Sequence, residues 1–168
     1  MIRRAIPADA RPIAEVHVRT WQEAYRGIVP DAVLDALDVD ERERSWNEWI
    51  GTPPEGAETF VADEHGAVVG FVNVGRDRSG EAGVGELNAI YLREEHWGRG
   101  IGQALMERAV AALSAAGYDE AVLWVLADNV RTRRFYEAAG WAADGAEQVL
   151  EGLGLAEVRY RTRLSASS

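Results

Sequence analysis

The stretch "EEHWGRGIGQALMERAV", residues 94–110, decides how this fold is read. Gly98, Gly100 and Gly102 stand at every second position, Arg99 stands between the first two, and a helical pattern follows at once. The first four amides of a helix lack partners within it, and with the helix dipole they attract anions. Glycines let a phosphate approach that backbone closely. The stretch predicts a phosphate-binding turn or a tight turn with solvated arginines, and the glycines alone do not decide between them.

Further arginines flank this turn in an otherwise acidic chain. Arg93 lies just upstream, and Arg131, Arg133 and Arg134 fall where the next predicted helix begins. The 168 residues carry a formal net charge of -10. Such a charge argues against nucleic acid as a partner, because nucleic acid requires a basic surface. It is compatible with a cationic partner or with solubility alone.

Two common nucleotide-binding motifs do not fit the residues that follow the glycines. A Walker loop requires a lysine and then Ser or Thr after its last glycine, whereas Gln103 and Ala104 follow Gly102. The dinucleotide fingerprint requires a third glycine three residues after the second, and Gln103 or Leu105 stands there. A magnesium–nucleotide module therefore lacks support.

Composition is typical of one globular domain, with 47% hydrophobic and 27% charged residues. No apolar run is long enough to cross a bilayer, and "MIRRAIPADARP" lacks the apolar segment of a secretory signal. The absence of cysteine excludes disulfides and thiolate metal sites, and the three histidines show no metal-ligand spacing. We expect a cytoplasmic protein with no metal, no membrane partner, one domain at 1–164 and a disordered tail at 165–168.

The hydrophobic period changes several times along the chain and predicts a mixed α/β sheet. In the first half of the chain we expect a strand at 2–6, a helix at about 10–26 capped by Asp9, a second helical region capped by Asp40, and two strands within 58–77 joined at His65–Gly66. A strand at 85–92 and a helix from the glycine turn to Gly117 should follow. The last part should contain a strand at 120–126, a helix at about 129–139, and two closing strands within 141–150 and 155–164. The strand–helix–strand unit at 86–125 should be parallel and right-handed.

Three segments together resemble the GNAT superfamily of N-acetyltransferases. "WGRGIGQALM" resembles the family's acetyl-CoA pyrophosphate loop, Gln/Arg-x-x-Gly-x-Gly/Ala, with Gly100 and Gly102 in place and Trp97 where Gln or Arg is usual. "LADNVRTRRFYEAAGW" is similar to the family's Asn-(six residues)-Tyr helix through Asn129 and Tyr136. "GELNAIYLREEHW" resembles the strand that leads into the loop. The segments stand in the family's order and spacing, and the resemblance extends over essentially the whole chain.

The resemblance implies a mostly antiparallel sheet of about seven strands flanked by about four helices. Its middle strands form a parallel pair that splays apart, and acetyl-CoA lies in the gap as co-substrate. Backbone groups of the fourth strand would pair with the pantetheine arm, and loop amides would hold the pyrophosphate. The cofactor-binding residues carried over in this way are Ile90, Tyr91, Leu92, Trp97, Gly98, Arg99, Gly100, Ile101, Gly102, Asn129 and Tyr136.

Transfer to a primary amine requires a base, because such amines are mostly protonated at pH 7. Glu86 is the first candidate, acting directly or through water, and Glu81 and Asp128 are weaker candidates. Departure of coenzyme A as a thiolate requires a proton, and the resemblance places Tyr136 to supply it. Asn129 would cap its helix and bond the pantetheine amide.

Aromatic residues of the first two helical regions are candidates for an acceptor pocket. Trp21 and Tyr25 lie one turn apart, and acidic residues crowd 31–48, so with Glu86 this region suits a cationic amine. Aromatic stripes at helical spacing are, however, more often part of a core. We therefore expect an enzyme that acetylates a small amine. Dimers are common in the family that the sequence resembles, so a homodimer is also an expectation from the resemblance. The alternatives are an acetyltransferase for a protein N-terminus or lysine, and a non-catalytic CoA-binding sensor or interaction module.

Overall fold

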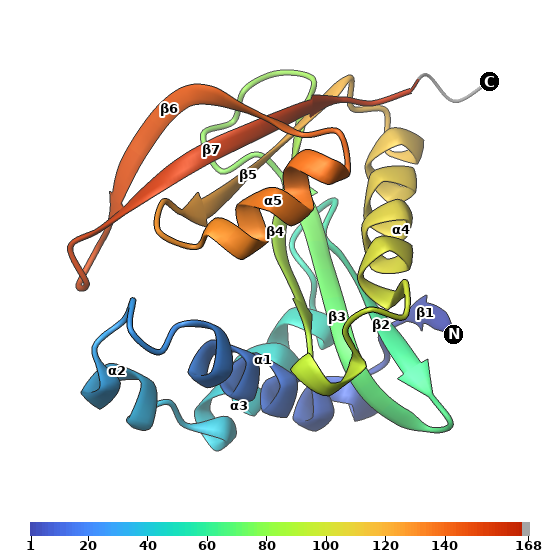
Figure 1. Ribbon diagram of the computed structural model, residues 1–168. Helices are drawn as coiled ribbons and strands as arrows, with labels where there is room; N and C mark the ends of the chain where they lie inside the picture. The colour runs from blue at the N-terminus through green and yellow to red at the C-terminus, as the bar shows by residue number, and fades with distance from the viewer. Residues whose placement is uncertain (166–168) are drawn as a thin grey trace.

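The computed structural model describes residues 1–165, which form a twisted seven-stranded sheet with helices on both faces (Figure 1). The strands are β1 (Ile2–Arg4), β2 (Glu58–Glu64), β3 (Ala67–Arg76), β4 (Val84–Leu92), β5 (Glu120–Leu126), β6 (Ala142–Leu150) and β7 (Leu155–Arg163). The helices are α1 (Ala10–Ala24), α2 (Asp31–Asp35), α3 (Val39–Gly51), α4 (Ile101–Ala115) and α5 (Val130–Ala138). The strand order is β1-β2-β3-β4-β5-β7-β6. Within residues 1–165, β4 and β5 form the one parallel pair, as predicted.

The predicted elements are present where turn residues mark their ends. β2 and β3 form the expected hairpin, and His65 and Gly66 take positive φ angles of 54° and 89°. Two successive positive φ angles match the twist of a two-residue hairpin. Gly117, with φ 93°, follows the end of α4. Asn129 caps α5, since its side chain accepts a hydrogen bond from the amide of Thr132.

Of two predicted helix caps, Asp9 holds the N-cap position of α1 without a capping side-chain bond, and Asp40 was wrong. The Asp9 side chain accepts no bond from the first turn of α1 and instead pairs with Arg3 at 2.8 Å. The cap of α3 is Asp38, whose carboxylate accepts from the amide of Asp40 at 2.8 Å. At α1 the ion pair with Arg3 takes the Asp9 carboxylate away from the helix amides, and at α3 the neighbouring Asp38 takes the capping role from Asp40. The described residues contain five α-helices where about four were expected, and the additional one is the short α2, which begins directly after Pro30.

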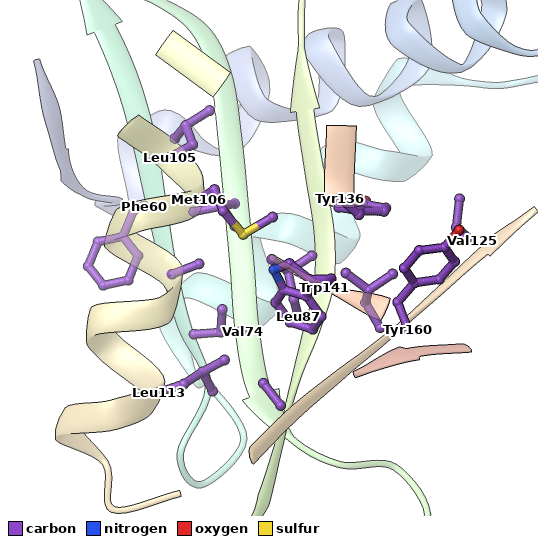
Figure 2. Close-up of a cluster of buried hydrophobic side chains, with 14 of the residues drawn as sticks. Phe60, Val74, Leu87, Leu105, Met106, Leu113, Val125, Tyr136, Trp141 and Tyr160 are labelled. Atoms are coloured by element: carbon purple, nitrogen blue, oxygen red, sulfur yellow. The ribbon is translucent and has the colours of Figure 1, made fainter. Parts of the chain in front are cut away.

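Side chains alternate across the sheet, so each central strand contributes to two cores. Val72 of β3 belongs to the cluster under α4 and α5, whereas its neighbour Phe71 belongs to the cluster with α1 and α3. Figure 2 shows the first cluster, with Leu105 and Leu113 of α4 and Val125 of β5. The sheet is therefore held from both sides.

The two middle strands separate soon after they begin. Their paired residues are Val84–Glu120, Gly85–Ala121 and Glu86–Val122. Beyond these pairs, β4 continues to Leu92 and β5 to Leu126 without further pairing to each other. On its other edge β4 pairs with β3, where the register shifts and Asn88 forms a bulge. The predicted splayed pair is thus present, and Figure 1 shows the two strands diverging.

The chain end is described as far as Ser165, whose carbonyl accepts a hydrogen bond from the Ser114 hydroxyl at 2.5 Å. The rest of the tail predicted at 165–168 lies outside the described residues. The domain boundary at 164 stays a prediction. Across residues 1–165, no helix combines the length and apolarity needed to span a membrane.

Gly70 of β3 provides a test of the close packing between β3, β4 and α4. A Cβ atom there would lie 2.8 Å from the Tyr91 carbonyl oxygen and 3.3 Å from a Leu105 methyl group. We predict that Gly70→Ala lowers the free energy of unfolding by about 1–3 kcal/mol. Gly51→Ala is the matched control, since a Cβ there meets nothing within 4 Å. Equal urea midpoints for Gly70→Ala and the wild type would contradict this packing.

Candidate active site

A cavity of about 680 Å³ lies between the separated ends of β4 and β5. Its wall is formed by the end of α1, the unpaired part of β4, the glycine turn, β5 and the first turns of α5, with two residues from β6 and β7. The sequence-predicted residues on this wall are Trp21, Tyr25, Glu86, Ile90, Tyr91, Leu92, Trp97, Gly98, Gly100, Gly102, Asn129 and Tyr136. Arg99 and Ile101 are not on it. The structure therefore brings together residues spread over most of the chain.

The backbone of β4 presents unused polar groups to this cavity. The amide of Arg93 bonds to the Val69 carbonyl of β3 at 3.0 Å. Because backbone groups alternate in direction along an antiparallel strand, Tyr91 also directs its amide and carbonyl to β3. Ile90 and Leu92 direct theirs into the gap, where the Leu92 carbonyl accepts from Trp97 Nε1 at 3.0 Å. Tyr91 reaches the cavity through its side chain instead.

The glycine turn forms the end of the cavity next to α4. Gly98 and Gly100 have φ angles of 79° and 80°, which side chains rarely tolerate. A Cβ atom at either position would meet nothing within 4 Å, so space lies above this backbone. Gly102 differs, because a Cβ there would lie 3.5 Å from the Phe135 ring. Backbone amides at the start of a 15-residue helix thus face an open, concave surface.

Of the arginines noted around this turn, the structure places one on the cavity wall. Arg93 pairs with Glu23 at 3.2 Å. Arg133 donates to the Tyr160 hydroxyl at 3.0 Å. Arg131 lines the cavity, and its guanidinium carbon lies 3.7 Å from the centre of the Trp97 ring.

Glu86 is the buried acid of the site. It is 1% exposed, although Glu86 is one of the residues that line the cavity. Arg78 donates to both oxygens, from its backbone amide at 3.0 Å and from Nε at 2.8 Å. Burial raises the pKa of Glu86, and the Arg78 contacts oppose that rise. The carboxylate is therefore fixed in position and more basic than an exposed glutamate.

Tyr136 and Asn129 stand on the opposite side of the cavity, on α5 and at its cap. Burial raises the pKa of Tyr136, so its phenol keeps its proton at neutral pH. Asn129 is 7% exposed, and its side-chain oxygen accepts from the Thr132 amide at 3.3 Å. The Asn129 side chain also lies within hydrogen-bonding reach of the Tyr25 phenol, and both residues line the cavity.

The aromatic residues divide between the cavity and the core. Trp21 packs edge-on against Tyr25 with ring centres 4.8 Å apart, and its Nε1 donates to the Tyr91 hydroxyl at 3.0 Å. All three line the cavity. Trp46 instead lies in the core under α1 and α3, with Trp49 packed against that cluster.

Among the polar and aromatic wall residues that sequence reasoning missed are Arg78, Trp124 and Glu157. Each reaches the cavity through strand register or a loop contact, and no local motif marks it. The weaker base candidates lie elsewhere: Glu81 pairs with Arg161 at 3.1 Å, and Asp128 is exposed outside the wall. In the described part of the chain, no group of three potential metal ligands lies close together.

Comparisons with known proteins agree with this geometry. Residues 17–141 match the family model described as Acetyltransferase (GNAT) family. The chain is 38% identical over 130 residues to the uncharacterized N-acetyltransferase YuaI of Bacillus subtilis, covering 76% of this chain and 72% of that protein. It is 27% identical to the probable N-acetyltransferase Rv2775 of Mycobacterium tuberculosis, covering 98% and 94%.

Two solved structures share the fold. PaiA N-acetyltransferase of Thermoplasma acidophilum, in complex with coenzyme A, has a TM-score of 0.76 at 18% identity and covers 97% of this chain and 98% of its own. YncA of Salmonella typhimurium, a putative acetyltransferase with acetyl-CoA, has a TM-score of 0.73 at 22% identity and covers 100% and 95%.

His17 supports the cavity wall from behind and provides a pH test. Its ring stacks on Tyr91 with centres 5.4 Å apart, and burial, with the nearby Arg42 charge, lowers its pKa from 6.5 to about 4. The folded protein therefore binds fewer protons than the unfolded chain between these pH values. The contribution of His17 to the free energy of unfolding is fully present above pH 6.5. It is lost as the pH drops toward 4, which lowers the free energy of unfolding by up to about 3 kcal/mol.

We predict that His17→Gln removes most of this loss of stability, measured by urea unfolding at pH 4.5 and pH 7. His65→Asn is the control, because His65 lies in the exposed β2–β3 turn. Aspartates with lowered pKa values, such as Asp9, lower the free energy of unfolding only when they are protonated, at more acidic pH. An unchanged pH dependence in His17→Gln would contradict the assignment to His17.

Proposed function

This chain belongs to the GNAT family of acetyltransferases, and on that premise we propose that it transfers an acetyl group from acetyl-CoA to a primary amine by direct attack. The observation that carries the proposal is the cavity between β4 and β5, in which the unpaired edge of β4 joins the open glycine turn. Such a space suits a ligand with a long peptide-like arm and phosphates at one end. A direct mechanism also suits a chain without cysteine.

The exposed edge of β4 matches the amide groups of a pantetheine arm. Ile90 offers both its amide and its carbonyl, and Leu92 offers its amide, because the Leu92 carbonyl already accepts a bond from Trp97 Nε1 at 3.0 Å. Asn129 lines the same space at the start of α5. Amides from Arg99 to Gly102 would hold the pyrophosphate, and the bound thioester would supply the acetyl group.

Glu86 takes the proton from the attacking amine, directly or through a water molecule. Its raised pKa brings the carboxylate closer to the basicity that a general base needs near neutral pH. Arg78 holds both oxygens, so the carboxylate keeps one orientation while the amine approaches. A fixed acceptor of this kind lowers the entropy cost of reaching the reactive geometry.

Tyr136 gives a proton to the sulfur of the departing coenzyme A. Its raised pKa keeps the phenol protonated, and its ring stands across the cavity from β4. The acid and the base therefore come from opposite walls, with the reacting atoms between them.

The acceptor end of the cavity favours a small cationic amine. Glu157 faces it from β7 without a cationic partner among residues 1–165, and Trp21, Tyr25 and Trp124 supply aromatic faces. Carboxylates and aromatic faces together attract ammonium groups. A protein N-terminus or a lysine side chain stays the alternative acceptor.

Thermal melting followed by an amine screen tests the proposal. Acetyl-CoA at about one hundred times its Kd should stabilise the protein by roughly 2.7 kcal/mol, whereas ATP and NAD at the same concentration should not. Release of coenzyme A should then increase with at least one small cationic amine. Stabilisation without turnover on any amine would favour a CoA-binding sensor, and no stabilisation would refute the cofactor assignment.

We predict that Tyr136→Phe lowers kcat by roughly 10²- to 10⁴-fold, because the departing thiolate loses its proton donor. The affinity for acetyl-CoA should change little. Tyr118→Phe is the matched control, since Tyr118 lies outside the cavity wall. Wild-type turnover by Tyr136→Phe across the pH range would show that another group supplies the proton.

We predict that Glu86→Gln lowers kcat/KM by roughly 10²-fold or more, because an amide cannot accept the proton. In the wild type, kcat/KM should fall as the pH drops through the raised pKa of Glu86, and Glu86→Gln should lack this fall. Glu107→Gln, on the outer surface of α4, is the control. Retention of the acidic limb in Glu86→Gln would assign that limb to a different group.

A further inference from the structure

Trp97 joins three segments at the phosphate end of the cavity. It precedes the glycine turn, its Nε1 donates to the Leu92 carbonyl of β4 at 3.0 Å, and its ring lies under Arg131 of α5. The guanidinium carbon of Arg131 is 3.7 Å from the ring centre, which is close contact for a cation on an aromatic face. The indole is therefore fixed at one edge and covered on one face.

Arg131 is charged and unpaired in this arrangement. Within residues 1–165 it takes part in no ion pair, whereas Arg93 and Arg78 each bind a carboxylate. Arg131 lines the same cavity as Gly98 and Gly100 of the glycine turn. Stacking fixes the plane of the guanidinium and leaves its N–H edges available to oxyanions.

The other arginines near the turn are placed differently. Arg99, inside the turn, and Arg134, one helical turn further along α5, lie outside the cavity wall, whereas Arg131, which is exposed like them, lines it. An acidic chain that binds a polyanion needs a positive group at the phosphate end. Arg131 is the arginine that is positioned for it.

We propose that Arg131, held on the Trp97 ring, is the main phosphate-binding cation of this cavity and that Trp97 is its positioning residue. The inference rests on the proposed function, because the phosphates are those of acetyl-CoA. Trp97 stands where the family's loop usually carries Gln or Arg, and in this chain it contributes to phosphate binding only by positioning Arg131. It supports an arginine from the neighbouring helix and holds the end of β4.

The test is calorimetric binding of coenzyme A and of pantetheine, which lacks the phosphates. Arg131→Ala should weaken coenzyme A binding roughly 10- to 100-fold and leave pantetheine binding unchanged. It should also make coenzyme A binding less sensitive to salt. Arg134→Ala is the matched control and should bind coenzyme A like the wild type, and Arg99→Ala should lose less than Arg131→Ala.

The variant Trp97→Leu tests whether Arg131 needs the Trp97 ring for its position or binds phosphate through its charge alone. It should reproduce most of the loss in coenzyme A affinity, and the double variant Trp97→Leu/Arg131→Ala should lose little more than Arg131→Ala alone. Arg131→Lys should recover part of the affinity only where Trp97 is present.

Three results would overturn the inference: additive losses in the double variant, equal losses of coenzyme A and pantetheine affinity in Arg131→Ala, or equal losses in Arg134→Ala and Arg131→Ala. Apo melting temperatures of the variants distinguish misfolding from lost contacts. A wild-type protein that binds neither coenzyme A nor pantetheine would refute the proposed function, and this inference with it.

Discussion

Hydrogen bonding between β4 and β5 stops after three residue pairs, and the site depends on this interruption. A strand in the middle of a sheet normally satisfies its backbone on both edges. Here the bulge at Asn88 and the divergence of β5 leave the gap-facing groups of Ile90 and Leu92 without a strand partner. Unpaired backbone groups inside a protein are costly, so this edge is suited to a ligand that carries amides of its own.

Packing at the two ends of the gap keeps the strands apart. At the closed end, a Cβ atom on Gly85 would lie 2.6 Å from a Leu113 methyl group, so α4 lies close against the sheet there. At the open end, Leu126 packs with Tyr25, Val29 and Leu34 in a separate apolar cluster. That cluster takes the end of β5 away from β4. The cavity is thus bounded by packed side chains at both ends.

The sequence predicted most of the elements, because their ends carry strong local signals. The hairpin at His65–Gly66 and the cap at Asn129 depend on residues within a few positions. Asp9 stands at the N-cap of α1, but its carboxylate pairs with Arg3 and makes no capping bond, and the cap predicted at Asp40 was wrong because the neighbouring Asp38 takes that role. Local propensity alone does not rank such competitors.

The site was predictable where motifs mark it and not where tertiary contacts decide it. Three segments indicated the glycine turn, β4 and α5, and the structure brings Glu86 and Tyr136 to one cavity. Arg78, Glu157 and the stacking of Arg131 on Trp97 follow from register and helix placement, which no local pattern reveals.

Amide hydrogen exchange at Ile90, followed by NMR with and without acetyl-CoA, tests most directly whether the gap in the sheet is the cofactor slot. The Ile90 amide faces the gap, whereas the Tyr91 amide faces β3. We predict that saturating acetyl-CoA slows exchange at Ile90 by about tenfold or more and leaves the already bonded Tyr91 amide nearly unchanged. Unchanged exchange at Ile90 in the saturated protein would contradict the account, because the ligand would then bind without completing the edge of β4.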